Sequence, residues 1–598
     1  MANEYFVDNS HPQASDSNSG LADSPWLTIQ QAANTMIAGD ICCVSQGIYH
    51  EVVQPQNSGH KDNLITFKAI GEVKVHGFRI IDKTYIRVIG FEITYLTDNP
   101  QAEGIFLLRS HGSEILNNYI HHTLSLGIRQ HYSGMTNLTI IKGNRIEYNG
   151  STPGNETGEI AISINGNKNI IEYNDVSHVG DFINIWGEKN IIRNNHFHDC
   201  YTSDFRDFTQ TEGPHIDGIQ YFSPHLHIPL NRSLVECNYI NNISVPHAHI
   251  ILLQDEEKDG SCELVFRNNL CGKIGSYIGG AAPFINLRLI HNTFFDFLEE
   301  QSPKAMYCIS FLYGSTGGKL INNIFFNCVR NGGGVYYLDT VSKDGFYSDY
   351  NAVYNSNCGQ NCYWDIPMRD EIHSLINYDP GFVDYPNNDF HLQHNSPCAN
   401  AAGPLTTTAS TGSGDVIGVI DAGYFSDGWG ITEGDYINVG GNDSLKILFI
   451  DYDNNSITVN QNISWISGDQ VNLSYYHQAP DIGAYEYREE EKSRYGVTIS
   501  KPFHMARVNG LVKIEMDMKN IENIRYIILF IDGLPIATIH EPPYTYIWDT
   551  NSIKLGIHNL EARAYALHAQ KDMTQSDMIR LLVVDDKIQP PANLQFLK

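Results

Sequence analysis

The segment Leu116-Asn117-Asn118-Tyr119-Ile120 decides the fold, because variants of it recur along much of the chain. In each copy a short apolar or aromatic run surrounds an asparagine. The copies centre on Asn118, Asn144, Asn174, Asn195, Asn238, Asn269, Asn292, Asn323 and Asn351. The successive intervals are 26, 30, 21, 43, 31, 23, 31 and 28 residues. An irregular period of this length, with β-branched and aromatic runs and no helical pattern, predicts an all-β solenoid of stacked coils.

Asparagine suits the corner of such a coil. Its side chain tolerates the left-handed backbone conformation and can hydrogen-bond its own backbone, and stacked amides can bond one another along the axis. We therefore expect the asparagines to occupy corresponding corners between residues 103 and 355, with Asn351 in a weaker last copy. The 43-residue interval contains the stretch 213–222, Gly-Pro-His-Ile-Asp-Gly-Ile-Gln-Tyr-Phe. An insertion on one coil usually builds the binding face of a solenoid.

Length and charge narrow the choice of partners. The chain has 598 residues, too many for one domain, and carries 39 basic against 68 acidic residues, a net charge of −29. This balance argues against nucleic acid and anionic membranes as partners, and a polyanionic substrate would need a local cation or a bound metal. The sequence has no run of 18 apolar residues, so we expect no membrane insertion. We also expect a monomer.

The first 25 residues lack the order of a signal peptide. We expect either a cytosolic protein or, as the favoured interpretation, the mature form of a secreted or cell-surface protein. Eleven cysteines show no metal-type spacing. Cys358 and Cys362 are a candidate disulfide.

Two groups of motifs bracket the coils. Residues 29–37 place Ile29, Ala32, Ala33, Met36 and Ile37 on one stripe, which predicts a short helix capping the first coil. Near it lie Tyr5-Phe6-Val7-Asp8, Ser24-Pro25-Trp26-Leu27-Thr28-Ile29, Ala38-Gly39-Asp40 and Gly47-Ile48-Tyr49. Late in the chain come Asp379-Pro380-Gly381-Phe382-Val383-Asp384, Asp389-Phe390-His391-Leu392, Ser396-Pro397-Cys398 and Pro480-Asp481-Ile482-Gly483-Ala484-Tyr485-Glu486.

These motifs resemble those of bacterial right-handed parallel β-helix proteins of the pectate-lyase-like kind. The resemblance implies that fold for residues 5–487. It also implies a carbohydrate-active enzyme (a lyase, a hydrolase or a uronate epimerase) or a non-catalytic surface protein. The terminal motifs are structural, so they do not choose among these activities.

Composition suggests the domain boundaries. We expect a parallel β-helix in 1–403, a small β insertion module in 404–475, a closing strand of the β-helix in 476–487, a charged linker in 488–495, a β-sandwich in 496–586 and a tail in 587–598. The sandwich resembles the immunoglobulin-like modules appended to bacterial secreted enzymes.

Alignment of the apolar runs places Glu159, Asp181, Asp217 and His249 at the starts of successive strands. Equivalent positions of adjacent coils stack about 4.8 Å apart, and like charges at that distance raise each other's pKa unless a cation separates them. Three interpretations stay open. In the first, the acids are solvated strand ends, or the alignment is wrong by one residue. In the second, Glu159, Asp181 and Asp217 bind calcium. In the third, Asp181 and Asp217 are the carboxylate pair of a glycosidase.

A calcium-assisted lyase would also need a base. The candidates are His249, His215 and Arg206. The long interval adds histidines, carboxylates and aromatics, among them His196, His198 and Asp199, which we expect on the same face. As substrate-binding residues we name Arg129, Asn184, Gln220, Tyr221 and Phe205. A zinc site from His225 and His227 is a weaker alternative.

The sequence thus predicts a secreted enzyme that cleaves a polysaccharide, with a slight preference for a calcium-assisted lyase acting by β-elimination on a uronate polymer. The alternatives are a glycoside hydrolase using the paired carboxylates and a non-catalytic cell-surface or adhesion protein.

Overall fold

The computed structural model describes residues 3–95, 102–152, 155–156, 160–204, 216–222, 229–245, 248–255, 261–274, 277–297, 307–328, 334–339, 341–355, 371–487, 496–502, 506–519, 524–532, 534–551, 553, 556–566, 574–575 and 579–583. The candidate disulfide of Cys358 and Cys362 lies outside these residues. None of the helices described is long and apolar enough to cross a membrane. The chain divides into two compact units, Met1–Tyr487 and Arg488–Lys598.

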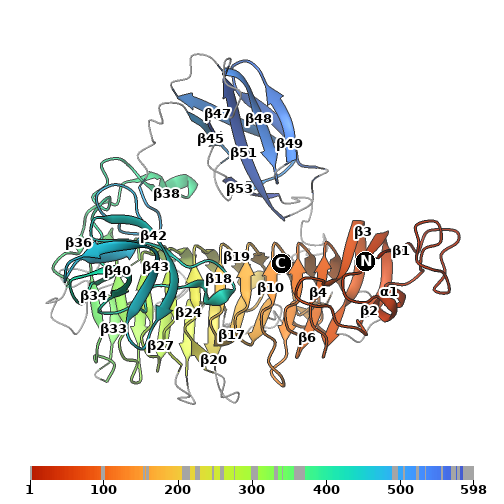
Figure 1. Cartoon of the computed structure of the whole chain (residues 1–598), viewed down its shortest axis with the longest axis horizontal. Helices are drawn as coiled ribbons and strands as arrows, with labels where there is room; N and C mark the ends of the chain where they lie inside the picture. The colour runs from red at the N-terminus through yellow and green to blue at the C-terminus, as the bar shows by residue number, and fades with distance from the viewer. Residues whose placement is uncertain are drawn as a thin grey trace, which may run out of the picture. The chain divides into compact units, whose positions relative to one another are not determined.

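The first unit is a solenoid of parallel strands (Figure 1), as the sequence predicts. Its strand pairings form three ladders that run along the coils. The first ladder contains β1 (Glu4–Val7), the beginnings of β2 (Ile41–Val53) and β3 (Ile65–Ile81), β4 (Ile86–Ile89), β7 (Glu114–Leu116), β10 (Ile140–Lys142), β15 (Ile170–Glu172), β18 (Ile191–Arg193), β22 (Leu234–Glu236), β25 (Val265–Arg267), β28 (Arg288–Ile290), β31 (Lys319–Ile321) and β34 (Tyr347–Asp349).

The other two ladders follow the next two sides of each coil. The second ladder contains the middles of β2 and β3, β5 (Glu92–Thr94), β8 (Tyr119–His121), β11 (Arg145–Glu147), β16 (Asp175–Ser177), β19 (His196–Tyr201), β23 (Tyr239–Ser244), β26 (Leu270–Ile274), β29 (Thr293–Phe297), β32 (Ile324–Phe326), β35 (Ala352–Tyr354) and β36 (Leu375–Ile376). The third contains the ends of β2 and β3, β6 (Ile105–Leu108), β9 (Ile128–Gln130), β14 (Ile162–Asn165), β17 (Ile183–Glu188), β20 (Asp217–Phe222), β24 (His249–Gln254), β27 (Tyr277–Ala282), β30 (Tyr307–Phe311) and β33 (Gly334–Leu338). The short β21 (Leu230–Asn231) pairs with the end of β17.

The predicted asparagine corners are confirmed. The nine asparagines lie between the first and second ladders, and the side-chain amide of each of the first eight donates to the side-chain oxygen of the asparagine on the next coil. This chain of bonds starts with Asn118 Nδ2 to Asn144 Oδ1 at 3.0 Å and ends with Asn323 Nδ2 to Asn351 Oδ1 at 3.1 Å. The 43-residue interval does not interrupt it, because Asn195 Nδ2 donates to Asn238 Oδ1 at 3.0 Å. The described part of the stretch 213–222, from Ile216 to Phe222, therefore belongs to an ordinary coil.

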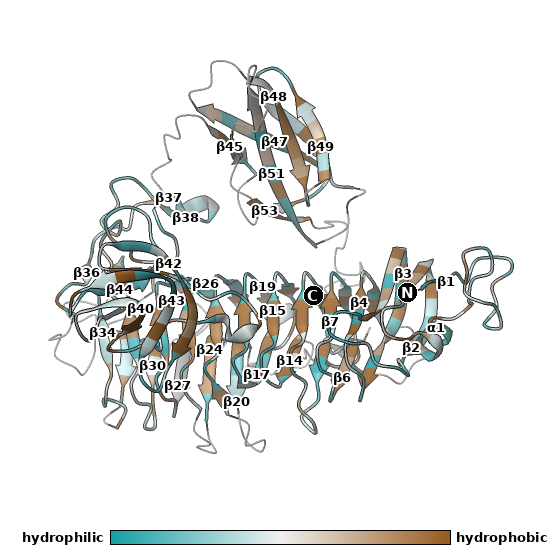
Figure 2. Cartoon of the chain, viewed as in Figure 1, coloured by the Kyte–Doolittle hydropathy of each residue, from teal (hydrophilic) through white to brown (hydrophobic). Residues whose placement is uncertain are grey.

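The helix α1 (Ile29–Thr35) is the expected N-terminal cap. Its residues Ile29, Ala32 and Ala33 join the solenoid core, as does Met36 just beyond its end. Ile37 does not follow the predicted stripe and is 60% exposed, because the helix has already ended. Inward-facing isoleucine, valine and phenylalanine from all three ladders fill the core, and Figure 2 shows these strands as the most hydrophobic parts of the coils.

The insertion forms one antiparallel sheet with the order β39-β44-β41-β42-β43-β40. Its strands are β39 (Thr406–Thr407), β40 (Gly412–Gly418), β41 (Tyr436–Val439), β42 (Asn442–Asp451), β43 (Ser456–Trp465) and β44 (Gln470–Leu473). The sheet shares a core with outward residues of the first ladder, including Ile191, Leu234 and Val265. An ion pair between the buried Arg267 and the half-buried Asp435, Nη2 to Oδ1 at 2.6 Å, joins the two. The insertion therefore covers one side of the solenoid.

The segment 476–487 does not form the predicted closing strand. It is irregular and packs on the last coils: Ile482 joins a cluster with Phe295 and Phe326, and the Gly483 N–H donates to the Asn322 carbonyl. The hairpin of β37 (Phe382–Asp384) and β38 (Asp389–Leu392) covers the same surface. The family-like closing motif thus covers the sides of the coils instead of extending a ladder.

The second unit is a two-sheet β structure with its own core around Ile514, Leu529 and Trp548. One sheet contains β45 (Gly496–Lys501), β47 (Leu511–Lys519) and β50 (Thr545–Asp549). The other contains β46 (Ala506–Val508), β48 (Ile524–Ile531), β49 (Leu534–Ile539), β51 (Gly556–Ala566), β52 (Thr574–Gln575) and β53 (Ile579–Val583). Its assignment as an immunoglobulin-like module stays a prediction.

Candidate functional site

Three of the predicted site residues lie together where strands of the third ladder begin. Asp217 opens β20 and pairs in register with His249, which opens β24. On the preceding coil, the Phe182 N–H donates to the Asp217 carbonyl at 3.0 Å, which sets Asp181 at the level of Asp217. Adjacent parallel coils therefore bring two carboxylates and an imidazole into one row.

Asp217 is the centre of this group. It is 0% exposed, and its Oδ1 lies 2.7 Å from His249 Nδ1. Its Oδ2 accepts a hydrogen bond from Gln220 Nε2 at 2.9 Å, and its own backbone N–H donates to Asp181 Oδ1 at 2.9 Å. A buried carboxylate needs such donors. These bonds fix both the Asp217 carboxylate and the ring orientation of His249.

Gly218 serves the stacking of coils. A Cβ at this position would lie 2.5 Å from the carbonyl oxygen of Ile250 on the next coil. Real Cβ atoms do not approach a backbone atom so closely, so a side chain here would push the two coils apart. The glycine therefore keeps β20 and β24 close enough for the Asp217–His249 bond.

The predicted register of the acidic ladder slips by one residue at its first member. Ile162 pairs with Ile183, so Ile160 lies at the level of Asp181. Glu159 itself lies outside the described residues, as do His215, Arg206 and Phe205 and the pair His225 and His227. The roles predicted for these residues stay predictions.

The described residues of the row do not fit a calcium site. Calcium takes six or more oxygen ligands. Here N–H donors occupy the oxygens: His249 and Gln220 face the two oxygens of Asp217, and the Asp217 amide occupies Asp181 Oδ1. The repulsion between Asp181 and Asp217 is thus relieved by hydrogen bonds.

Three of the predicted substrate-binding residues form one row on the outer face of the third ladder. Arg129 pairs with Ser163, Ser163 with Asn184, and Asn184 with Gln220. Arg129 Nη1 also bonds Glu103 Oε1 at 2.9 Å. The row ends at Gln220, which contacts Asp217. Guanidinium, hydroxyl and amide groups in line are suited to the hydroxyl and carboxylate groups of a glycan.

Tyr221 does not belong to this row. It is 0% exposed inside the solenoid, where its hydroxyl accepts a hydrogen bond from Ser261 Oγ at 2.8 Å. Side chains of a strand alternate between its two faces, so an outward Gln220 forces Tyr221 inward. The prediction of Tyr221 as a substrate-binding residue is wrong.

A second polar surface lies on the outer face of the second ladder. It consists of the residues one and three positions after each of five ladder asparagines: Tyr119, His121, Arg145, Glu147, Asp175, Ser177, His196, His198, Tyr239 and Asn241. The expectation that His196 and His198 share a face with Asp217 is wrong, because β19 belongs to the second ladder and β20 to the third. The same two positions on later coils carry mostly apolar residues, which the closing segment covers.

Charged groups in this surface are buried and mutually paired. Arg145 Nη2 lies 2.8 Å from Glu147 Oε2, and the Tyr119 hydroxyl donates to the other Glu147 oxygen. Burial alone would raise the pKa of Asp175, but His198 and His196 hold it well below its usual range. Burial, together with His198, lowers the pKa of His196 to about 4.

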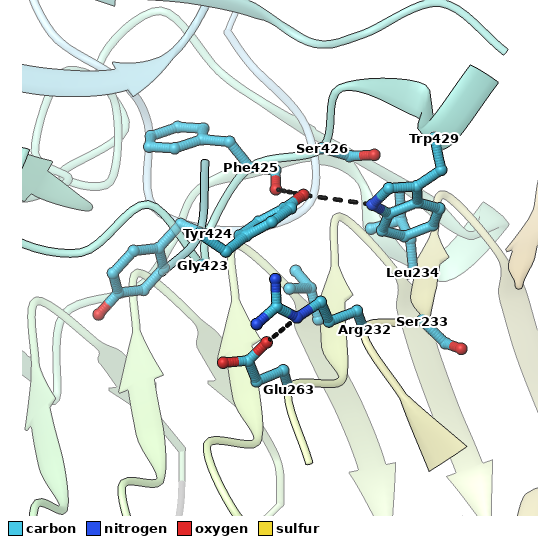
Figure 3. A pocket seen from close by; sticks show the side chains of 11 residues that line it. Arg232, Ser233, Leu234, Glu263, Gly423, Tyr424, Phe425, Ser426 and Trp429 are labelled. Carbon is cyan, nitrogen blue, oxygen red and sulfur yellow. Dashed lines mark hydrogen bonds and ion pairs between the residues drawn. The ribbon is translucent and has the colours of Figure 1, made fainter. Parts of the chain in front are cut away.

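A small pocket lies between the insertion and the first ladder (Figure 3). Its polar groups bond one another: Arg232 Nε to Glu263 Oε2 at 2.5 Å, and Trp429 Nε1 to the Tyr452 hydroxyl at 3.3 Å. The Arg232 guanidinium also stacks on the Tyr452 ring at 4.4 Å. The pocket is therefore part of the packing interface that holds the insertion on the solenoid.

Comparisons with known proteins address the fold. A family model described as "Right handed beta helix region" matches residues 76–219. No curated protein gives a significant match. One similar solved structure is the pectate lyase Pel9A, with 11% identity over 82% of this chain and 97% of its own, and a TM-score of 0.44. Another is the GH136 lacto-N-biosidase from Eubacterium ramulus, with 12% identity over 59% of this chain and 68% of its own, and a TM-score of 0.41. A rhamnogalacturonan lyase has 13% identity over 58% of this chain and 87% of its own, with a TM-score of 0.40. These values are too low to transfer an activity. The three parallel ladders, with the family match over residues 76–219, make the first unit of this chain a right-handed parallel β-helix.

Proposed function

We propose that this protein is a secreted polysaccharide-cleaving enzyme that acts by β-elimination on a uronate polymer, with His249 as the base. The observation that carries the proposal is the bond between His249 Nδ1 and Asp217 Oδ1, 2.7 Å long, on a carboxylate that is 0% exposed. A carboxylate that fixes one ring nitrogen sets the tautomer of an imidazole and strengthens its basicity at the other nitrogen.

The proposed step uses the Nε2 side of the ring. With the proton of the neutral ring on Nδ1, facing Asp217, the basic lone pair is on Nε2. His249 takes the C5 proton of the uronate, the electron pair forms a C4–C5 double bond, and the C4–oxygen bond breaks. The leaving oxygen then gains a proton. Imidazolium formed during the step is stabilised by the buried Asp217 carboxylate.

The outer row of the third ladder supplies binding groups for such a substrate. The Arg129 guanidinium pairs with Glu103 at 2.9 Å, so it offers N–H donors to a substrate carboxylate and adds no unpaired positive charge to the row. Asn184 and Ser163 offer hydrogen bonds to hydroxyl groups along the row. Gln220 connects the row to the base, since it pairs with Asn184 and bonds Asp217.

Elimination is favoured over hydrolysis because of the state of Asp217. A glycosidase pair needs two carboxylates that reach the scissile bond. Both Asp217 oxygens are engaged, one by His249 and the other by Gln220. This arrangement supports an orienting role for Asp217 better than a nucleophilic or acidic one.

The test is turnover on a panel of uronate and neutral polymers, followed by the ultraviolet absorbance of the unsaturated product and by reducing-end release. His249→Asn keeps a donor near Nδ1 but removes the base, so kcat should fall by about 100-fold or more. The matched control is His373→Asn, because His373 Nδ1 lies the same 2.7 Å from Asp349 in the last coils; it should retain wild-type turnover.

Release of reducing ends without the unsaturated product would show that the enzyme acts by hydrolysis and would contradict elimination. An unchanged kcat in His249→Asn would remove His249 as the base. A wild-type protein that binds glycans but cleaves none of the panel would favour the adhesion alternative.

A further inference from the structure

Three side chains of the second ladder bring metal-ligand atoms together away from the third-ladder row. They are Asp175 on β16 and His196 and His198 on β19, and all three are buried. His198 Nε2 lies 3.0 Å and His196 Nδ1 3.5 Å from Asp175 Oδ2. Ligands about 2.0–2.2 Å from one tetrahedral or octahedral ion lie about 3.0–3.5 Å apart, so these separations match a site for a single small ion.

The other nitrogen of each imidazole has an oriented acceptor. His198 Nδ1 lies 2.8 Å from Asp199 Oδ2, and His196 Nε2 lies 3.0 Å from Asn241 Oδ1. Metal-binding histidines usually donate their second N–H to a carboxylate or carbonyl oxygen, which directs the lone pair of the first nitrogen at the ion. Both rings therefore have the outer contacts expected of metal ligands.

His196 gives a second, independent indication. With its proton on Nε2, facing Asn241, its Nδ1 has a lone pair directed at the Asp175 carboxylate. The residue is 4% exposed, and among the described residues this Nδ1 has no hydrogen-bond partner. Two buried acceptors facing each other are unfavourable unless a cation lies between them.

The fold holds the three groups rigidly. Asp175 pairs with His196 across adjacent coils, and strand alternation puts His198 on the same face. The two imidazoles stack 3.8 Å apart, and the Tyr239 ring stacks on His196 from the next coil at 4.9 Å. The neighbouring cation, Arg145 on the preceding coil, is in register with Asp175 and forms its ion pair with Glu147.

We propose that Asp175, His196 and His198 bind one divalent first-row transition ion, with Zn²⁺ as the reference ion. Two imidazole nitrogens and one carboxylate oxygen are ligands that zinc and its neighbours accept, whereas calcium requires a shell of oxygens. Three protein ligands leave at least one coordination position for water or a glycan hydroxyl. The site is independent of the proposed elimination at His249.

The experiment is metal binding to the full chain after removal of metals with a chelator and dialysis. Zn²⁺ is titrated against a fluorescent competitor, Co²⁺ is added to a separate sample to record its visible ligand-field bands, and Ca²⁺ is titrated in parallel. We expect one Zn²⁺ per chain, Co²⁺ bands at one equivalent, a higher melting temperature with Zn²⁺, and no competition by Ca²⁺.

Variants assign the ligands. His196→Gln and His198→Gln should each weaken Zn²⁺ binding by about 100-fold or more, and Asn241→Ala by about 10- to 100-fold, since Asn241 only orients His196. The control is His178→Gln, because His178 Nδ1 pairs with Asp204 at 3.0 Å outside the triplet; its affinity should equal that of wild type. Thermal melting without metal tests whether each variant folds. If a histidine variant does not fold, Asn241→Ala provides the test in its place.

Two results would overturn the proposal. One is a wild-type chain that binds no stoichiometric Zn²⁺ and shows no Co²⁺ bands, which would make the triplet a buried Asp175–His198 ion pair. The other is Zn²⁺ affinity that stays unchanged in the folded His196→Gln, His198→Gln and Asn241→Ala variants.

Discussion

At the scale of single residues, the function of a buried histidine here depends on what each of its two ring nitrogens contacts. His249 directs Nδ1 at a carboxylate, and His196 directs Nε2 at an amide oxygen. His291 is different, because both of its nitrogens have neutral partners. Its Nδ1 bonds the Asp481 carbonyl at 3.0 Å and its Nε2 lies 3.1 Å from Asn322 Nδ2. This ring is neutral and structural, and it holds the closing segment on the coils.

His291 should make stability depend on pH. Burial, assisted by the charge of Arg267, lowers its pKa from 6.5 to about 4. The unfolded chain therefore takes up a proton near pH 6.5 that the folded chain resists. The stabilising contribution is complete above pH 6.5 and is lost as the pH falls through 4, by about 3 kcal/mol in all.

The measurement is the free energy of unfolding in urea at steps between pH 7 and about 4. His291→Gln should have a flatter profile than wild type over this range, while His60→Gln, at an exposed position, should follow wild type. Parallel profiles for wild type and His291→Gln would contradict the assignment.

At the scale of elements, the asparagine ladder explains why so much of the fold was predictable. Each coil repeats one corner, and only a small residue with an amide satisfies both the backbone and the neighbouring coil. Within a coil, strand alternation decides which residues face outward, and this depends on a register that sequence does not display. For that reason the sequence places Tyr221 on the wrong face and aligns Glu159 with Asp181, although Ile160 lies at that level.

The second-ladder surface was missed for a related reason. The sequence predicts one face for the polar residues of the long interval, but β19 belongs to the second ladder and β20 to the third. A usable signal was present: counting one and three residues from each ladder asparagine gives Arg145 and Glu147, then Asp175, then His196 and His198. Residues 205–215 lie outside the described structure, so the predicted roles of His215, Arg206 and Phe205 stay predictions.

Removal of one asparagine from the ladder should destabilise the first unit strongly. Asn238 accepts hydrogen bonds from the backbone N–H and Nδ2 of Asn195 and donates to the Ile192 carbonyl. In Asn238→Ala these buried groups lose their partners, at a cost of about 3 kcal/mol or more. Asn454→Ala, in an exposed turn, should change stability by less than about 0.5 kcal/mol. Urea unfolding measures the stability of both variants. Equally small changes in the two would show that the asparagine ladder does not stabilise the fold.

At the scale of the whole molecule, the solenoid uses additional segments to cover its apolar sides. The insertion covers outward residues of the first ladder, and the closing segment covers the later coils of the second. Both belong to the unit that ends at Tyr487, whereas the second unit has a core of its own. The candidate residues of both sites belong to the first unit.

A chain ending at Tyr487 should therefore fold and keep both proposed properties. Its core and its covering segments are complete within the unit, and domains with separate cores fold separately. We expect a cooperative melt, wild-type kcat on a soluble polymer, and unchanged Zn²⁺ affinity. Aggregation of this shorter chain, or loss of either property while it stays folded, would show that the second unit contributes to the sites.

The most direct test of the proposed function is the kinetics of Asp217→Asn on a polymer that the wild type cleaves, with and without added calcium. Asparagine keeps the shape and one acceptor oxygen but removes the charge that orients His249 and stabilises its protonated form. We expect a fall in kcat of about 100-fold or more, a KM close to wild type, an intact melting transition, and no recovery with calcium. A kcat equal to that of wild type, or a rate restored by calcium, would contradict the proposed function.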